Sequence, residues 1–401
     1  MAIKEITPKE LDSLTPGRFL LIDAREKAEY DYGAVPCCVY FSPEQLESMA
    51  EQNDPALPKD WLLVLYSSRD ASSLALAAGL KERGFETCVL TGGYSAWALY
   101  SVQKRVNSAE NSDSALPAAS EIEKSIQKRF HGRLMGPFAR AILKYNMIQE
   151  GDRIAVCISG GKDSMLMAKL FQEFQKHGHV PFELRFIVMD PGYNSNNRAM
   201  IENNLRLLGI PAEVFETRIF DAVYTIENSP CYLCARMRRG YLYRKAADLG
   251  CNKIALGHHY DDVIETALMG MLYSGQWSAM MPKLWSTNFP GMELIRPMYF
   301  IREEDIRLWR DANRLYFLQC ACRFTEETAY ADKEKGAHSL SKRQETKQLI
   351  AQLKKTNPQI ETNIFHATEN VTIDKLLGYK KNGRRHSFLD TYSEQDGSAE
   401  A

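Results

Sequence analysis

The chain lacks long hydrophobic runs. No stretch of about eighteen apolar residues occurs, so the sequence predicts no membrane-spanning helix. The first residues, MAIKEITPKE, also lack the basic start and apolar run of a signal peptide. The 9 cysteines are an odd number, which argues against a disulfide framework and favours metal binding or thiol chemistry. We therefore expect a cytoplasmic protein without membrane contact.

Net charge is scarce as well, at -1 for the whole chain, which argues against indiscriminate binding to nucleic acid. Residues 1–100 hold 9 Lys+Arg against 15 Asp+Glu, so the remainder of the chain is net positive. This asymmetry is compatible with a local basic surface on the larger part. It is equally compatible with solvated charged faces on a neutral enzyme, and charge alone favours that second interpretation.

The length of 401 residues predicts more than one domain. Residues 1–100 alternate short apolar runs, FLLID and WLLVLYS, with the helical pattern SSLALAAGLKERG, which predicts a small α/β domain. Residues 101–120 are poor in large apolar side chains and predict a mobile linker. A larger domain over 121–330 follows. Residues 331–401 predict a helical extension with a flexible tail.

The larger domain begins with a helical segment whose apolar residues recur at helical spacing: Ile122, Ile126, Phe130 and Leu134. Five strand-like runs then alternate with helical patterns: RIAVCIS, LRFIVMD, AEVFET, KIALGHH and ELIRPM. Strands that alternate with helices predict an α/β fold with a doubly wound parallel sheet. Ligands of such sheets bind outside the carboxyl ends of the strands, and the motifs described next lie there.

The first of these strands runs into the string SGGKDS, which precedes the apolar helix MLMAKLF. The glycines let the backbone turn tightly and point N–H groups at an anion, while the helix N-terminus and the lysine add positive charge. The spacing GxxxxGK[ST] is absent, so this is not a Walker A loop. A glycine pair alone would be an ordinary turn, but the whole string predicts a phosphate-binding loop. Its residues are Ser159, Gly160, Gly161, Lys162, Asp163 and Ser164.

SGGKDS resembles the signature of the PP-loop ATP pyrophosphatases, which release pyrophosphate and leave an adenylated substrate. The resemblance implies that the loop binds the phosphates of ATP with Mg2+ and that Lys162 and Asp163 are catalytic. Polar residues at the ends of the second and fourth strands would face the same crevice, either as satisfied polar groups or as nucleotide and magnesium contacts. Their position favours contacts, and the candidates are Asp190, Gly257, His258, His259 and Asp262.

Two cysteine pairs lie in the larger domain. Cys231 and Cys234 form CxxC at the start of a helical segment, and Cys320 and Cys322 form CxC after the segment REEDIRLWRDANRL. A thiolate near a helix N-terminus is suited to metal ligation or redox chemistry. A zinc site, a redox dithiol and an iron-sulfur cluster all remain open, because spacing does not separate zinc from iron-sulfur. Cysteines flanked by apolar residues are expected in the core: Cys88, Cys157 and Cys251.

Residues 121–330 resemble the tRNA 2-thiocytidine synthetase family through SGGKDS, CYLC, GHHYDD, MMPKLW, LIRPM and the late cysteine. In that family three cysteines hold a [4Fe-4S] cluster whose fourth iron stays open for sulfide. Carried over by position, these ligands are Cys231, Cys234 and Cys320. The last site often has PCxxC in the family but QCAC here, which leaves Cys322 as a substitute third ligand.

The N-terminal domain resembles a single rhodanese domain through LLIDAREKAEYDYGAVP, VLYSSRDASSLALAAGLKERGF and VLTGGYSAW. Rhodaneses carry sulfur as a persulfide on a cysteine that begins an anion-binding loop, and Ser67 stands at that position. A serine hydroxyl cannot hold a persulfide. The usual loop glycine, loop arginine and GHIPGA histidine are replaced by Asp70, Ser72 and Ala34.

This domain is therefore expected to be catalytically inactive and dispensable for the chemistry, with a role in docking or in contacts of a homodimer. Two neighbouring thiols, Cys37 and Cys38 in VPCCVY, are alternative sulfur carriers. Because cysteine is among the most frequently buried residue types, we expect both to be buried instead.

The resemblance to the synthetase family also implies the reaction. ATP adenylates the C2 oxygen of a cytidine, sulfide attacks that carbon, and AMP departs, while magnesium and Lys162 neutralise charge on the pyrophosphate. The product would be 2-thiocytidine in a tRNA anticodon loop. A cysteine desulfurase system would provide the sulfide or persulfide donor.

Three basic clusters are candidates for contacts to RNA phosphates. One follows the CxxC pair: Arg236, Arg238 and Arg239. Another lies in the helical lead-in: Lys124, Lys128, Arg129 and Arg133. The last lies in the tail: Lys380, Lys381, Arg384 and Arg385. Each cluster alone is more often a solvated face, and the first is favoured because it lies beside the expected chemistry.

Two other classes of function remain open. The same domain could thiolate another base or a small molecule, or use its cluster to remove sulfur, although a desulfurase would not need an intact SGGKDS. Alternatively, the chain is a non-catalytic sulfur-trafficking protein, as an inactive rhodanese-like domain suggests. An ATP-pyrophosphatase assay separates that binding protein from the enzymes.

Overall fold

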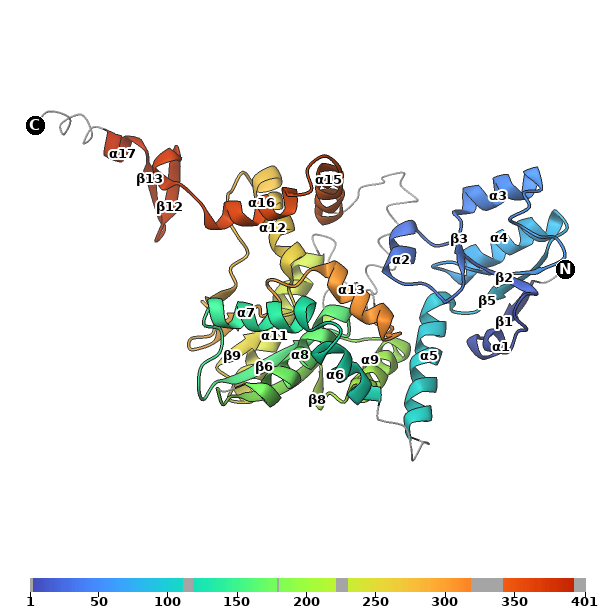
Figure 1. Ribbon diagram of the computed structural model, residues 1–401, viewed down its shortest axis with the longest axis horizontal. Helices are drawn as coiled ribbons and strands as arrows, with labels where there is room; N and C mark the ends of the chain where they lie inside the picture. Colours follow the sequence, from blue (N-terminus) through green and yellow to red (C-terminus); the bar gives the residue numbers. More distant parts are fainter. Residues whose placement is uncertain (1–2, 111–117, 179, 221–229, 319–341, 393–401) are drawn as a thin grey trace, which may run out of the picture. The chain divides into compact units, whose positions relative to one another are not determined.

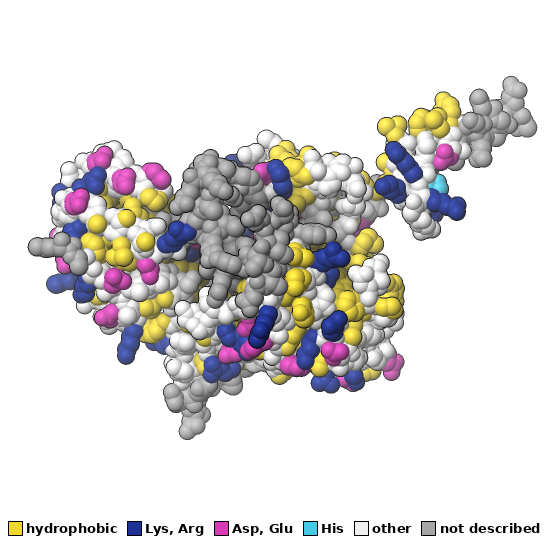
Figure 2. All heavy atoms as spheres, turned by 180° about the vertical axis from the view of Figure 1, so that it is seen from behind, with side chains coloured by type: hydrophobic (Ala, Val, Ile, Leu, Met, Phe, Trp, Pro, Cys, Tyr) yellow, Lys and Arg dark blue, Asp and Glu magenta, His cyan; other side chains and the backbone are white. Residues whose placement is uncertain are grey.

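The computed structural model of the chain (Figure 1) describes residues 3–110, 118–178, 180–220, 230–318 and 342–392. Residues outside these segments are grey in Figures 1 and 2. The chain divides into two compact units. The first comprises Met1–His259 and Pro282–Ala337, and the second comprises Tyr260–Met281 and His338–Ala401. The phosphate loop therefore lies in the first unit, and Asp262 in the second.

A five-stranded parallel sheet forms the N-terminal part of the first unit, with strand order β1-β5-β4-β2-β3. Its strands are Lys4–Ile6 (β1), Phe19–Asp23 (β2), Val39–Tyr40 (β3), Leu62–Tyr66 (β4) and Glu86–Leu90 (β5). Its helices are Pro8–Asp12 (α1), Lys27–Tyr32 (α2), Pro43–Gln52 (α3), Asp70–Glu82 (α4) and Gly93–Glu110 (α5). The small α/β fold expected for this part of the chain is confirmed.

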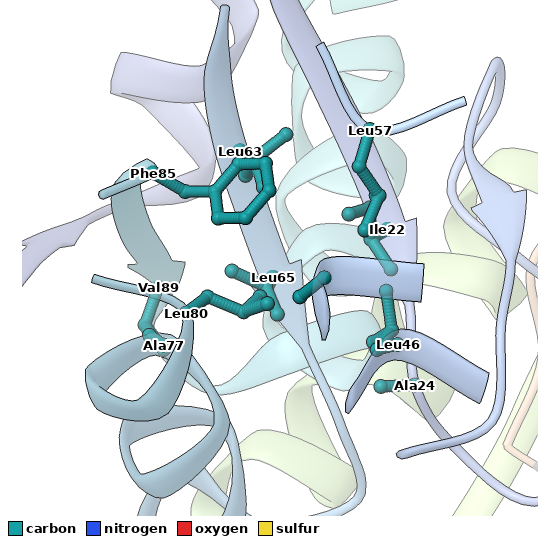
Figure 3. Packing of buried hydrophobic residues seen from close by; sticks show 11 residues of the cluster. Ile22, Ala24, Leu46, Leu57, Leu63, Leu65, Ala77, Leu80, Phe85 and Val89 are labelled. Atoms are coloured by element: carbon teal, nitrogen blue, oxygen red, sulfur yellow. The ribbon is translucent and has the colours of Figure 1, made fainter. Parts of the chain in front are cut away.

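Both faces of this sheet are covered by apolar side chains. Leu63 and Leu65 of β4 face a core that includes Leu46 of α3 and Leu80 of α4 (Figure 3). The alternate residue Val64 belongs to a second core cluster. Successive side chains of a strand point to opposite faces, so a central parallel strand is apolar throughout. Each such buried side chain stabilises the fold by roughly 1.5–3 kcal/mol.

Helix α5 corrects the expected linker. The helix continues to Glu110 because Ala98, Val102 and Val106 recur every fourth residue and are at most 4% exposed. It packs against α9, Ser195–Leu208, of the larger domain. A polar linker can therefore extend only over residues 111–117, which lie outside the described residues.

The second sheet of the first unit has six strands in the order β10-β11-β9-β6-β7-β8. They are Arg153–Ile158 (β6), Glu183–Asp190 (β7), Ala212–Glu216 (β8), Lys253–Ala255 (β9), Lys283–Trp285 (β10) and Glu293–Ile295 (β11). All five strands expected from the sequence are present and parallel. The short edge strand β10 pairs antiparallel with β11 and was not expected.

Helices and one π-helical turn accompany this sheet (Figure 1). They are Ala118–Gln127 (α6), His131–Met135 (η1), Gly136–Lys144 (α7), Lys162–His177 (α8), α9, Pro230–Asp248 (α11) and Glu303–Ala312 (α13). The apolar residues of the lead-in are at most 4% exposed, as expected: Ile122, Ile126, Phe130 and Leu134. Strand β6 is central, with β7 on one side and β9 on the other. The direction of the strand order reverses there, which is where ligands of such sheets bind.

The second unit contains Tyr260–Ser274 (α12), Lys342–Thr356 (α15), Ile360–Glu369 (α16), Ile373–Lys375 (η2), Gly378–Lys381 (β12), Arg384–Ser387 (β13) and Leu389–Tyr392 (α17). Tyr260 stacks on Phe365 with ring centroids 4.7 Å apart. The expectation of a helical extension with a flexible tail is wrong for β12 and β13, which form a hairpin. Among the described helices, none is long and apolar enough to cross a membrane.

Candidate functional site

Gly160 gives the phosphate loop its shape. Its φ of +87° lies in the left-handed region, and a Cβ there would lie 2.6 Å from Ile201 Cγ1. Only glycine adopts this conformation without strain at that close approach. The next residue, Gly161, is extended and caps α8, so the chain turns from β6 directly into the helix N-terminus.

The side chain of Ser164 fixes this turn. Ser159 N donates to Ser164 Oγ at 3.1 Å, and Ser164 Oγ donates to Gly161 O at 3.0 Å. Ser164 is only 5% exposed, so its hydroxyl serves the loop. The first N–H groups of an α-helix have no partner within the helix and favour an anion. The N-terminus of α8 is therefore suited to bind an anion.

The two charged loop residues have different surroundings. Lys162 Nζ lies 3.1 Å from Asp163 Oδ2 and 3.2 Å from Glu303 Oε1, and the lysine side chain is 6% exposed. Asp163 Oδ1 is buried and accepts no hydrogen bond, while His259 Nε2 lies 3.9 Å from it. The lysine charge is thus compensated, whereas one carboxylate oxygen of Asp163 keeps its lone pairs for a cation or a donor.

A cavity of about 320 Å³ lies beside this oxygen. It is lined from the strand ends, the loop and α11 by Cys157, Ile158, Ser159, Asp163, Ser164, Met189, Arg238, Leu242, Leu256, Gly257 and His258. A Cβ on Gly257 would lie 3.3 Å from Ser164 N, so the loop after β9 approaches the helix N-terminus closely. The structure therefore brings the SGGKDS loop, the GHH segment and the arginine that follows CxxC to one cavity.

His258 lines the cavity, whereas Asp190 of the same unit is not among the lining residues. Arg296 Nε donates to His258 Nδ1 at 3.4 Å. Asp190 accepts from Gly192 N at 2.8 Å and from Arg198 Nη1 at 2.6 Å, so it holds the turn after β7. In the second unit, Asp262 lies 3.3 Å from Arg343.

Of the cysteines expected to ligate a cluster, the structure describes the side chain of Cys234 alone. Cys231 is the second residue of α11, but nothing is described of its side chain, and Cys320 and Cys322 lie outside the described residues. Cys234 is buried in an apolar group with Phe220 and Met189, and the latter also lines the cavity. An apolar shell that limits solvent access suits a thiolate ligand of a metal cluster. This donor fits the proposed cluster, and the other ligands remain predictions.

Of the three arginines after CxxC, one faces the cavity. Arg238 lines it and donates to Tyr193 Oη at 3.3 Å. Arg236 and Arg239 are exposed. The spacing explains the difference, because Arg238 follows Cys234 by four residues and so lies on the same helix face.

The cysteines expected in the core are buried. Cys88, Cys157 and Cys251 are 0%, 7% and 6% exposed. Burial raises the pKa of the Cys88 thiol to about 11, and burial also raises the pKa of the other two thiols. A neutral thiol is a poor nucleophile and ligand, so burial argues for a core role of Cys157 although this residue lines the cavity.

The expectation that Cys37 and Cys38 are both buried is wrong for the first. Cys37 is exposed with a φ of +63°, whereas Cys38 is half-buried. Cys38 Sγ lies 3.3 Å from Tyr66 Oη, and burial is the main cause that raises the pKa of this thiol. The prediction rested on the general preference of cysteine for the interior, which takes no account of the turn that exposes Cys37.

The rhodanese-type loop after β4 is closed by its own side chains. Ser67 Oγ donates to Arg69 O at 2.8 Å, and Ser67 N donates to Ser73 Oγ at 2.8 Å. Asp70 accepts a hydrogen bond from Gly92 N at 2.9 Å. Ser67, Ser73 and Asp70 therefore bind to groups of the domain itself, and the catalytic inactivity of this domain stays a prediction.

Sequence reasoning missed the contacts between the N-terminal domain and the neighbourhood of the phosphate loop. Tyr32 Oη donates to Leu318 O at 2.8 Å, and Lys162 Nζ lies 5.7 Å from the centroid of the Tyr32 ring. Arg105 Nη1 donates to Asn313 O at 3.0 Å. The two residues of each pair lie more than a hundred positions apart in the chain, and no local pattern signals these contacts.

Comparison with known proteins agrees with this geometry. Residues 134–322 match the model of a PP-loop domain, and residues 7–100 match that of a rhodanese-like domain. Fold and loop thus define an α/β PP-loop protein with a rhodanese-like domain at its N-terminus. Both expectations from the sequence are confirmed.

Two relatives are named tRNA-cytidine(32) 2-sulfurtransferase. The protein from Syntrophotalea carbinolica is 35% identical over 255 residues, which cover 63% of this chain and 94% of that protein. The protein from Geotalea uraniireducens is 36% identical over 256 residues, which cover 63% of this chain and 96% of that protein. The chain belongs to the tRNA-cytidine(32) 2-sulfurtransferase family. A solved structure, the U34-tRNA thiolase NcsA from Methanococcus maripaludis with its [4Fe-4S] cluster, is similar to it with a TM-score of 0.44 and 19% identity, covering 72% of this chain and 81% of that one.

Proposed function

We propose that the chain is an ATP-dependent tRNA sulfurtransferase that adenylates a cytidine in an anticodon loop and converts it to 2-thiocytidine. Membership of a family whose members carry the sulfurtransferase name supports this activity. The observation that carries the proposal is the shared cavity. The SGGKDS loop and the CxxC helix α11 both line it, so phosphate chemistry and sulfur chemistry have access to one base.

The residues of this cavity suit the activation step. The C2 oxygen of cytidine attacks the α-phosphorus of ATP, and pyrophosphate leaves. The N-terminus of α8 would bind phosphate oxygens, and Asp163 Oδ1 would hold Mg2+, which prefers oxygen ligands. Lys162 exchanges one of its two carboxylate partners for a phosphate oxygen and so neutralises developing charge.

Arg238 suits the recognition of RNA, because this residue of α11 lines the cavity and a guanidinium can pair with a phosphate or a base edge. A [4Fe-4S] cluster held by Cys231, Cys234 and Cys320 would supply a binding site for sulfide. Sulfide replaces the activated oxygen at C2, and AMP departs with that oxygen. A cysteine desulfurase system of the cytoplasm provides the sulfur as sulfide, or as a persulfide whose outer sulfur a thiol reductant reduces to sulfide. A homodimer remains a prediction.

The test uses two carboxylates at the same edge of the sheet. Asp163→Asn removes the charge of the orphan oxygen, whereas Glu216→Gln changes a carboxylate that is 79% exposed at the end of β8. With tRNA, ATP and sulfide supplied, the first variant should lose thiolation by about 100-fold or more and the second should keep it. The cluster absorbance should be equal in both. Wild-type thiolation by Asp163→Asn would contradict the nucleotide role.

A further inference from the structure

The C-terminal hairpin β12–β13 has a defined geometry. Its strands pair antiparallel, with Tyr379 opposite His386 and Lys380 opposite Arg385. The turn residues Asn382 and Gly383 have φ values of +49° and +77°. Two consecutive residues with positive φ make the turn that matches the twist of a two-residue hairpin, and Asn-Gly is its preferred sequence. The register of the four cations is therefore fixed by the turn.

This register places like charges directly opposite one another. Lys380 faces Arg385, and Lys381 faces Arg384 across the two strands. All four side chains are exposed, and within the described residues none of them has an acidic partner. Like charges at directly opposite positions destabilise a strand pair, and an isolated two-stranded hairpin is only marginally stable. Repulsion between these cations thus destabilises the free hairpin, and a bound polyanion would relieve that repulsion.

An aromatic pair adjoins these charges. The rings of Tyr379 and His386 stack with centroids 4.8 Å apart and an interplanar angle of 13°. Side chains alternate between the faces of a strand, so this pair shares a face with Lys381 and Arg384. Figure 2 shows Lys and Arg side chains gathered on this small hairpin. Cations beside a flat aromatic surface are the combination that binds phosphates and unstacked bases of RNA.

We propose that the hairpin β12–β13 is a tRNA-binding element that contacts the phosphate backbone through Lys380, Lys381, Arg384 and Arg385. This inference rests on the proposed function, because it takes tRNA as the polyanion. The alternative polyanion is an anionic membrane, for which the exposed Leu377 and Leu389 beside the hairpin would be the apolar contacts. The stacked ring pair and the family membership favour RNA.

The experiment compares two full-length variants that each lose four positive charges. The first changes Lys380, Lys381, Arg384 and Arg385 to Gln, and the control changes four exposed cations of the N-terminal domain to Gln: Lys4, Lys9, Arg18 and Lys59. Filter binding of unmodified tRNA over a range of salt concentrations gives Kd and its salt dependence. The hairpin variant should bind about tenfold more weakly, and the slope of log K against log salt should fall by about 3, since each phosphate contact contributes roughly 0.7–0.9.

A charge-conserving variant guards against a folding defect. Exchanging Lys for Arg and Arg for Lys at the four positions should restore both the Kd and the slope. At saturating tRNA the Gln variant should keep the wild-type kcat and show only a raised KM for tRNA. An unchanged Kd in the Gln variant would overturn the hairpin proposal and leave the proposed function standing. Loss of binding to phosphatidylserine vesicles without loss of tRNA binding would overturn it in favour of a membrane, and wild-type protein that binds no tRNA would overturn both proposals.

Discussion

Replacing Gly160 by Ala tests the geometry of the phosphate loop. The new Cβ would lie 2.6 Å from Cγ1 and 2.9 Å from Cδ1 of Ile201, a residue of α9 that is 0% exposed. A non-glycine residue at a φ of +87° costs roughly 1–3 kcal/mol in backbone strain. Overpacking against a buried side chain adds roughly 1–3 kcal/mol. We therefore expect Gly160→Ala to lower the free energy of unfolding by about 2–6 kcal/mol and to raise the KM for ATP.

A double-mutant cycle separates the two causes. Ile201→Ala removes both crowding atoms and by itself costs about 2–5 kcal/mol, because it leaves a cavity. With Gly160→Ala added, the total loss should be smaller than the sum of the single losses by about 1–3 kcal/mol, the overpacking part. The backbone strain should remain, since no change in α9 alters φ.

Gly161→Ala is the matched control. This neighbour is extended, with a φ of -82°, and the nearest atoms to its Cβ would be Leu318 O and Ser159 Oγ at 3.7 Å. The expected loss is only about 0.5–1 kcal/mol, because alanine is a poorer helix N-cap than glycine but meets no close contact here. Urea unfolding and the ATP dependence of pyrophosphate release measure both quantities. Equal stability and equal KM for Gly160→Ala and Gly161→Ala would refute the reasoning.

Three further predictions concern other parts of the chain. Lys253→Met should lower the free energy of unfolding in urea by about 3–5 kcal/mol, because it removes a cation whose Nζ lies 2.9 Å from a carboxylate oxygen of the buried Glu293. Lys283→Met is the control: its Nζ lies 3.5 Å from the other oxygen of Glu293 and its side chain is 34% exposed, so the loss should be less than about 1 kcal/mol. Equal losses in the two variants would contradict this prediction. Anaerobically purified Cys320→Ala should contain less iron than Cys322→Ala, and the reverse order would make the second thiol the ligand. Protein that begins at residue 115 should still thiolate tRNA when free sulfide is supplied. Its KM for ATP should be raised, because the hydrogen bond from Tyr32 to Leu318 is lost. Complete inactivity of a folded, cluster-loaded truncation would refute this prediction.

Local features of the chain could be predicted from the sequence. The SGGKDS loop follows from a strand, two glycines and a helix that are adjacent in the chain, and its geometry is as expected. The five parallel strands follow from apolar runs of ordinary length. The edge strand β10, KLW, was missed because three residues carry too little pattern and the strand is defined by its pairing with β11. The hairpin β12–β13 had a signal, Asn382-Gly383, that the surrounding polar residues obscured.

Tertiary contacts account for the remaining differences. Asp190 was expected to face the nucleotide because it ends a strand, but Arg198 and the backbone of the following turn occupy its oxygens. The partner of Lys162 in α13, Glu303, lies 141 positions along the chain and has no motif of its own. Tyr32 contacts Leu318 across two domains. Such pairings depend on how sheets and helices pack, which the order of residues along one segment does not specify.

The most direct test of the proposed function is mass spectrometry of nucleosides after a single reaction. Anaerobically reconstituted protein is incubated with unmodified tRNA, ATP, Mg2+ and sulfide, and the digested tRNA is analysed for thiolated nucleosides while AMP and pyrophosphate are quantified. We expect 2-thiocytidine to form in proportion to AMP, and only when ATP is present. Release of AMP without any 2-thiocytidine, or 2-thiocytidine formed without ATP, would contradict the account.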